Sequence, residues 1–261
     1  MAQLLVAAAA LLAIAVIAIV AFTRRTVRWG ARPEERSMRM PGDEYFTGDT
    51  PAFVAMTRAI NIDAPPETVW PWLAQLGRGA GFYSFDRLDN GGKTSARHIV
   101  SWIPEVRVGD ATAIGYVSHA IPGLELTWWA PPAPFLGSMC RLAVDIRLTQ
   151  ENGGSRLLIR MSGDAEGGMP RTVVAVFRFI DSVMARRQLL GIKHRVEQHG
   201  ARTSNPEHPE TGARDQYQLY EVVYATGERA GVPGKEAGEH WHRVAANAKL
   251  ISHQNDGSKA Q

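Results

Sequence analysis

The hydrophobic pattern of the chain begins with one long apolar run. Residues 4–22 contain no charged residue, no proline and no glycine, and a group of arginines follows at once. A helix rises about 1.5 Å per residue, so a helix of this length matches the hydrocarbon thickness of a bilayer. The run therefore predicts a transmembrane helix over residues 1–23 that contacts the lipid bilayer through residues 4–22.

Two other interpretations of this run stay open, a cleaved secretory signal and a buried helix of a soluble protein. The run is longer than the apolar part of a usual signal, and no basic side chain precedes it. The nearby basic residues all follow the run, and such residues are retained on the cytoplasmic side of a membrane. We expect a single-pass protein of the cell membrane with its globular domain on the cytoplasmic side.

After the apolar run the pattern of apolar and polar residues changes twice. Residues 24–50 are rich in charge, proline and glycine without a sustained period, which predicts a juxtamembrane linker. Residues 53–63 alternate apolar with other positions and predict a strand. Pro66 suits the first turn of a short helix with a core-facing apolar stripe, and Gly77 ends it.

The clearest alternation lies in the middle of the chain. Apolar residues occupy every second position from Cys140 to Leu148, and a return strand follows the turn at residues 151–154. This pattern is typical of a β-hairpin in a half-buried antiparallel sheet. A similar alternation over residues 124–129 predicts a further strand.

After Pro170 the apolar residues take a helical period for more than twenty residues. The apolar positions that mark this helix are Val173, Val176, Phe177, Ile180, Val183, Met184, Leu190 and Val196. Its other face carries Arg178, Arg186, Arg187, Lys193 and Arg195. Because this is the only element long enough to cover the sheet, the chain is predicted to have an α+β fold.

Several separated segments resemble bacterial members of the START-like superfamily, also called SRPBCC or polyketide cyclase/dehydrase-like proteins. The similarity covers about residues 41–198. The segments that carry it are Pro41-Gly42-Asp43-Glu44, Ala64-Pro65-Pro66-Glu67, Val69-Trp70-Pro71-Trp72-Leu73, Gly81-Phe82-Tyr83-Ser84, Val108-Gly109-Asp110, and Val183-Met184-Ala185-Arg186-Arg187 through Leu190-Gly191-Ile192-Lys193.

The resemblance implies a helix-grip fold, in which a curved antiparallel sheet wraps around a long C-terminal helix and leaves an elongated apolar cavity between them. It implies a START-like ligand-binding domain over residues 51–200. Behind it we expect a polar extension over residues 201–261, with a short amphipathic helix from Lys235 to Ile251. Members of the superfamily include carriers, receptors and enzymes, so the fold does not give the chemistry.

Large aromatic side chains are the candidates for lining such a cavity. We expect Trp72, Phe82, Tyr83, Trp128 and Phe177 to contact a hydrophobic ligand. The alternative is that these side chains only fill the core, since seven tryptophans have to be buried somewhere.

Catalytic, metal and cofactor sites are not predicted. Ser84, Asp86, His98 and His119 could supply acid or base groups, but their spacing singles out no dyad or triad. Residues 239–242 bring a glutamate and two histidines together, but residues two apart on a helix point away from each other. The single cysteine excludes an intrachain disulfide and a cysteine-based metal site.

Composition favours no nucleic-acid partner, because the net charge is only +3 and most basic residues are interleaved with acids. The arginines after the apolar run are explained more simply by attraction to anionic lipid headgroups. Two functions stay open. One is a membrane-anchored module that binds a hydrophobic small molecule or lipid, and the other is a cyclase, aromatase or dehydratase acting on a polyketide-like substrate. The absence of an identifiable acid/base set favours the binding module.

Overall fold

The structure is a computed structural model that describes residues 1–46, 54–101, 103–135 and 138–200. Its helices are α1 (Ala2–Thr26), α2 (Pro33–Ser37), the 3-10 helix η1 (Pro41–Phe46), α3 (Pro66–Ala74), α4 (Asp86–Asp89) and α5 (Arg171–His199). Its strands are β1 (Val54–Ile62), β2 (Tyr116–Ile121), β3 (Glu125–Phe135), β4 (Ser138–Glu151) and β5 (Gly154–Ala165). The predicted C-terminal extension and its amphipathic helix lie outside the described residues.

The five strands form one antiparallel sheet in the order β1-β5-β4-β3-β2. The predicted hairpin is confirmed, because β4 and β5 pair along their length up to Glu151 opposite Gly154. Asn152 and Gly153 form its turn with φ angles of 51° and 81°. Both are residue types that adopt positive φ in a two-residue hairpin turn.

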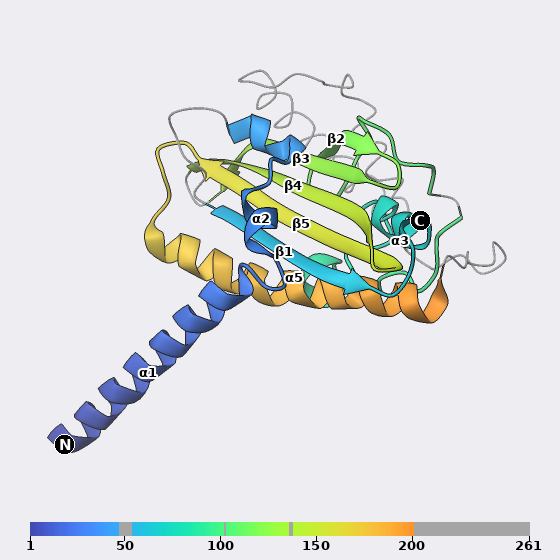
Figure 1. Cartoon of the computed structure of the whole chain (residues 1–261). Helices are drawn as coiled ribbons and strands as arrows, with labels where there is room; N and C mark the ends of the chain where they lie inside the picture. Colours follow the sequence, from blue (N-terminus) through green and yellow to red (C-terminus); the bar gives the residue numbers. More distant parts are fainter. Residues whose placement is uncertain (47–53, 102, 136–137, 201–261) are drawn as a thin grey trace, which may run out of the picture.

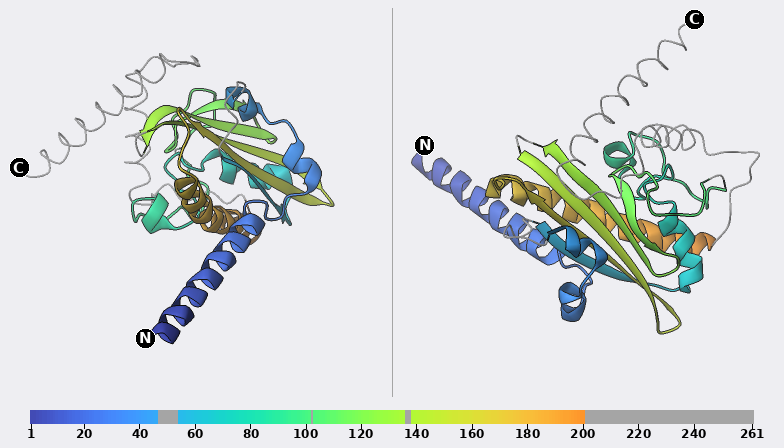
Figure 2. Two further views of the ribbon diagram at one scale, coloured as in Figure 1. Left: turned by 90° about the vertical axis from the view of Figure 1, so that its left-hand side faces the viewer. Right: turned by 90° about the horizontal axis from the view of Figure 1, so that it is seen from above.

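Helix α5 crosses one face of the curved sheet, which we call the inner face (Figures 1 and 2). Alternation along the strands divides the side chains between this face and the outer face. The buried apolar residues of the inner face are Met56, Ile60, Ile62, Val117, Leu126, Trp128, Val144, Ile146, Leu148, Leu157, Ile159 and Ala165. Sheet and helix together are the helix-grip arrangement, so the predicted fold class is confirmed.

Helix α5 is confirmed as an element, but the prediction that its apolar positions form one face, opposite the basic residues, is wrong. Its buried residues are Ser182, Leu189, Ile192 and Val196. Several of the residues that defined the predicted stripe are exposed on its other side: Val176, Ile180, Val183 and Leu190. The helical period was therefore correct, but it cannot tell which of two apolar faces meets the sheet.

The predicted linker contains a segment that packs on the domain. Residues 29–46, which include α2 and η1, lie along the outer face of the sheet (Figure 1). Met40 of this segment is buried against Ala59 and Leu158. The sequence showed no period here because the segment is held by individual contacts rather than by a regular apolar stripe.

Helix α1 extends away from the domain (Figure 1). The most apolar 18-residue stretch of this helix has a mean hydropathy of 2.8, and none of that stretch is buried inside the structure. The helix is long and apolar enough to cross a membrane, a property that a signal sequence would share.

Candidate functional site

Four of the five predicted ligand-contacting residues lie together near the C-terminal half of α5. Trp72 on α3 and Tyr83 in the following loop have their ring centres 5.8 Å apart in an edge-on arrangement. Phe82 meets Trp128 of β3 in the same manner at 6.4 Å. The structure therefore brings these residues into one aromatic cluster, whereas Phe177 lies on the first half of α5.

The contacts of Trp72 and Tyr83 are those of core residues. The exposed fractions are 0% for Trp72 and 2% for Tyr83. The Trp72 indole N–H donates to the carbonyl oxygen of Gly200 over 2.8 Å, and the Gln75 amide donates to the Tyr83 hydroxyl over 2.6 Å. Their role in ligand binding stays a prediction, and the geometry gives them the separate task of fixing α5 against α3.

A close backbone contact holds this end of α5 in place. A Cβ atom on Gly191 would lie 2.1 Å from the carbonyl oxygen of Tyr83, so only glycine lets α5 come this near. The Arg195 guanidinium lies 4.6 Å from the centre of the Tyr83 ring and donates to the carbonyl oxygen of Ala96. The second half of α5 is thus held tightly against residues 83–96.

Trp128 differs from the other members of the cluster. Its side chain is buried on the inner face, opposite Val144 of β4. Its indole N–H has no hydrogen-bond acceptor among the described residues. A buried donor without an acceptor costs free energy, so a ligand oxygen or a water at this position would stabilise it.

The opposite end of the inner face is less completely covered. Cys140, Leu142 and Met161 occupy inner positions on β4 and β5 and remain partly exposed, and we call these three residues the open end of the inner face. Leu142 and Met161 pack against the edge of the main core. Phe177 is half-buried on the part of α5 that crosses this end.

A buried ion pair joins three elements beside the open end. Arg58 of β1 is 2% exposed and lies 2.6 Å from Asp181 of α5. It also donates to the carbonyl oxygen of Thr26, the last residue of α1, over 3.1 Å. Burial raises the pKa of Asp181, although the charge of Arg58 and its hydrogen bond act in the opposite direction.

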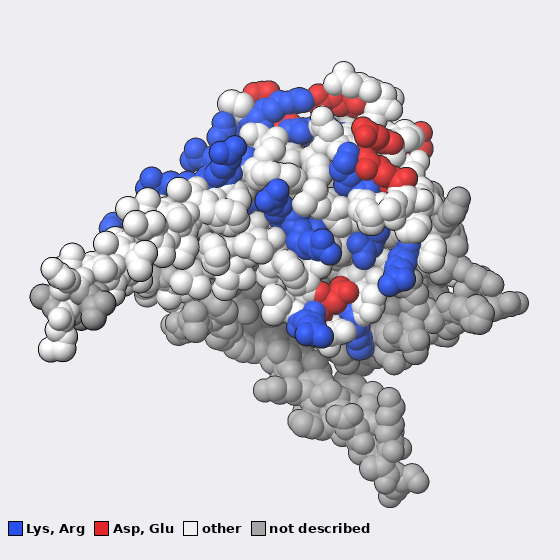
Figure 3. All heavy atoms as spheres, turned by 90° about the horizontal axis from the view of Figure 1, so that it is seen from below, with Lys and Arg blue, Asp and Glu red and all other residues white. Residues whose placement is uncertain are grey.

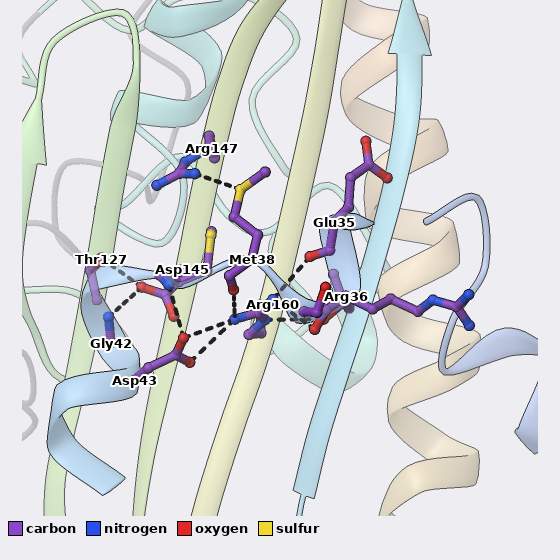
Figure 4. Close-up of polar contacts among 12 residues, drawn as sticks. Glu35, Arg36, Met38, Gly42, Asp43, Thr127, Asp145, Arg147 and Arg160 are labelled. Atoms are coloured by element: carbon purple, nitrogen blue, oxygen red, sulfur yellow. Dashed lines mark hydrogen bonds and ion pairs between the residues drawn. The ribbon is translucent and has the colours of Figure 1, made fainter. Parts of the chain in front are cut away.

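The outer face carries a network of buried polar groups beneath residues 29–46 (Figure 4). Arg160 of β5 donates to Asp43 over 3.0 Å, to Thr57, and to backbone carbonyl oxygens of residues 35, 36 and 38. Arg156 and Glu35 form a two-pronged ion pair in which both N···O distances are 2.7 Å. Burial acts to raise the pKa of Glu35, but hydrogen bonds from Arg156 and from the Arg32 backbone outweigh it and lower the pKa.

Asp145 of β4 holds η1 on the same face. Its carboxylate accepts hydrogen bonds from the Gly42 backbone N–H over 2.7 Å and from the Thr127 hydroxyl over 2.8 Å. Burial raises the pKa of Asp145 against the effect of these two hydrogen bonds. Sequence reasoning missed this network because alternating arginines on a strand are typical of a solvent-facing side, and only the docked segment buries them.

A hollow of about 560 Å³ lies at the border between this segment and the sheet. It is distinct from the predicted ligand site on the inner face. Its lining is mainly polar and comes from the segment, the strands and Arg28, which precedes the segment. The lining residues are Arg28, Pro33, Arg36, Ser37, Asp43, Phe46, Ala55, Thr57, Arg160 and Ser162.

The four residues considered for acid or base chemistry do not converge. Ser84 donates to the carbonyl oxygen of Met184, and Asp86 accepts from Ser95. His119 lies on β2, with its Nε2 3.0 Å from Glu125, while the ring of His98 lies 5.5 Å from that of His199. Within the described part of the chain, no three His, Cys, Asp or Glu residues lie close enough to hold a metal ion.

Comparisons with known proteins give likenesses to solved structures. No protein-family model and no curated protein matches the chain. DynU16, a protein of the dynemicin biosynthetic locus, is 17% identical with a TM-score of 0.35; the match covers 57% of this chain and 49% of DynU16. NE0264 from Nitrosomonas europaea is 12% identical with a TM-score of 0.39, over 57% of this chain and 97% of that one. CalU16 from Micromonospora echinospora is 14% identical with a TM-score of 0.32, over 66% and 88%.

The chain spans about half the length of DynU16. These are distant likenesses, and the assignment of the fold depends on the strand order, the register and α5 themselves. The fold is the helix-grip fold of START-like proteins. The resemblance noted in the sequence is therefore confirmed at the level of the fold.

Proposed function

We propose that this protein is a membrane-anchored module that holds a hydrophobic small molecule or lipid against the inner face of its sheet. The observation that carries the proposal is the open end of the inner face. Cys140, Leu142 and Met161 point toward α5 yet keep part of their surface exposed, while the other end of the same face is fully packed. Apolar surface left open beside a packed core favours an apolar ligand.

Trp128 supplies the polar contact of the proposed site. By register it pairs with Val144, the next inner position along β4 from Leu142. Its unpartnered indole N–H would donate to an oxygen of the ligand. Of the five predicted site residues, we retain Trp128 and Phe177 as ligand contacts and assign Trp72, Phe82 and Tyr83 to the packed end.

The proposed membrane anchor would keep the domain beside the bilayer, from which a hydrophobic ligand could be drawn. Helix α1 would cross the membrane with the domain on the cytoplasmic side, because its last turn carries Arg24 and Arg25. Tethering keeps the site at a high effective concentration relative to molecules dissolved in the same bilayer.

The geometry favours binding over a cyclase-type reaction. General acid or base catalysis needs titratable groups directed at one position of a substrate. Asp181 is the carboxylate of α5 that has a raised pKa, and it is already paired with Arg58. We therefore assign this pair to the joining of α1, β1 and α5.

The proposal is tested by identifying what co-purifies with the full chain. The protein is extracted from native membranes into lipid nanodiscs, and bound small molecules are measured by mass spectrometry. Met161→Trp fills the open end, whereas Ile121→Trp adds the same ring at an exposed position on β2. We expect the bound molecule with the wild type and with Ile121→Trp, and its loss with Met161→Trp. Equal recovery with both variants would contradict the proposed site.

A further inference from the structure

The outward side of α5 carries an apolar stripe where a soluble domain would present polar residues. Val176, Ile180 and Val183 are 58%, 49% and 36% exposed. Their spacing of four and three residues places them on one side of the helix. We call these three residues the apolar stripe.

The character of this side changes along the helix. Continuing the same spacing leads to Arg187, Leu190 and His194, so the second half of α5 presents mixed and charged groups to solvent. The apolar stripe is thus confined to the first half of α5. The neighbours of that half should therefore explain why apolar residues are exposed there.

The first half of α5 is the part that meets α1. The rings of Phe22 and Phe179 lie 6.0 Å apart. Just beyond α1, the Trp29 ring lies 5.4 Å from the guanidinium of Arg186 at the middle of α5. Arg58 binds both the last carbonyl of α1 and Asp181 of α5. These contacts fix the direction in which α1 leaves the domain, and both Figure 1 and Figure 2 show α1 leaving from the side of the domain where α5 begins.

The charges around the stripe complement an anionic membrane surface. Arg24 and Arg25 lie in the last turn of α1, and Arg28 follows it. Arg171, at the start of α5, and Arg187, beyond the stripe, are exposed. In Figure 3 an uncharged surface extends from α1 onto the adjoining part of the domain, with Lys and Arg side chains at its border.

From this juxtaposition we propose that the first half of α5 lies in the headgroup region of the bilayer that α1 enters. The apolar stripe is buried among the lipids, and the surrounding arginines contact lipid phosphates. An apolar face flanked by basic residues is the pattern of a helix that lies in the membrane interface. The inference depends on the membrane anchor proposed above, and it adds that the domain rests on the bilayer in a fixed orientation, with the open end of the inner face near the lipids.

The experiment places a fluorescent label at matched positions of the full chain. Cys140 is first replaced by serine, and single cysteines are then introduced by Ile180→Cys in the stripe, Ile121→Cys on β2 and Ile14→Cys in α1. Ile180 and Ile121 are both isoleucines of similar exposure, 49% and 42%. Each labelled protein is reconstituted in vesicles of phosphatidylcholine and phosphatidylglycerol that contain spin-labelled lipids.

We expect a loss of fluorescence at position 180 with a spin label near the lipid headgroup, and no loss at position 121. We also expect loss at position 14 with a spin label deep in the acyl chains. Loss of fluorescence at position 14 without loss at position 180 would support the membrane anchor and overturn the interfacial position of α5. Loss at neither position would overturn both the anchor and the interfacial position. A label at 180 shielded from aqueous iodide as well as from the lipids would show that residues 201–261 or a second copy cover the stripe, and would also overturn the inference.

Discussion

The two halves of α5 differ in how completely their apolar side chains are buried against the sheet. In the second half, Leu189, Ile192 and Val196 are buried against the sheet. In the first half, the inward groups include Ser182 and the ion-paired Asp181, while the apolar stripe is exposed. The helix therefore belongs to two environments, a packed core at one end and an unpacked surface beside α1 at the other.

This difference separates the packed part of the fold from the part to which we assign the proposed functions. The packed half gains its stability from apolar burial and from the close approach at Gly191. The other half lies where Arg58 joins α1 to the sheet. Beside it some inner-face side chains stay partly exposed, and the apolar stripe faces away from the sheet. Apolar packing is thus concentrated at one end of α5, and the proposed functions at the other.

Among variants that test this difference between the two halves, the largest loss of unfolding free energy is expected from breaking the buried ion pair of the first half. Arg58→Met leaves Asp181 buried without its partner, and breaking such a pair costs about 3–5 kcal/mol. The free energy of unfolding is measured by guanidinium titration of the full chain in detergent micelles. The double variant Arg58→Met, Asp181→Leu serves as the control and should recover most of the loss. A small effect of Arg58→Met alone would mean that the first half is not held by this pair.

An intermediate effect is expected from two neighbouring leucines of the second half. Leu189→Ala removes a side chain that is 0% exposed, which costs about 2–5 kcal/mol of unfolding free energy. Leu190→Ala alters a side chain that is 41% exposed and should change it by no more than about 0.5 kcal/mol. The same guanidinium titration compares them. Equal losses from both would disprove the packing described for this half.

The smallest effect is a pH dependence carried by Asp181. Because burial raises its pKa, the folded chain keeps this proton to a higher pH than the unfolded chain does. Its contribution to stability is therefore full below the ordinary pKa of an aspartate and declines as the pH rises through the raised pKa. Asp181→Asn should flatten that part of the profile of unfolding free energy against pH. An unchanged profile would show that Asp181 titrates normally.

The candidate site was predictable only in part, as Trp128 and Trp72 illustrate. Both were expected near a ligand because they are large, aromatic and close to predicted sheet or helix positions. The structure leaves the Trp128 N–H without an acceptor among the described residues, while the Trp72 N–H donates to Gly200. Sequence spacing cannot separate these cases, since the difference depends on which distant backbone group comes within reach.

By itself the sequence determined the apolar run, the β4–β5 hairpin, the long final helix and, through separated motifs, the helix-grip fold. The first three features depend on local periodicity, which the chain carries in neighbouring residues, whereas the fold was implied by the resemblance. The tertiary structure alone decided that residues 29–46 cover the outer face, that Arg58 meets Asp181, and that the apolar stripe faces away from the sheet. Those outcomes depend on contacts between residues far apart in the chain. A helix with apolar residues on two sides could bury either side, and only its contacts with the sheet and with α1 decide which side is buried.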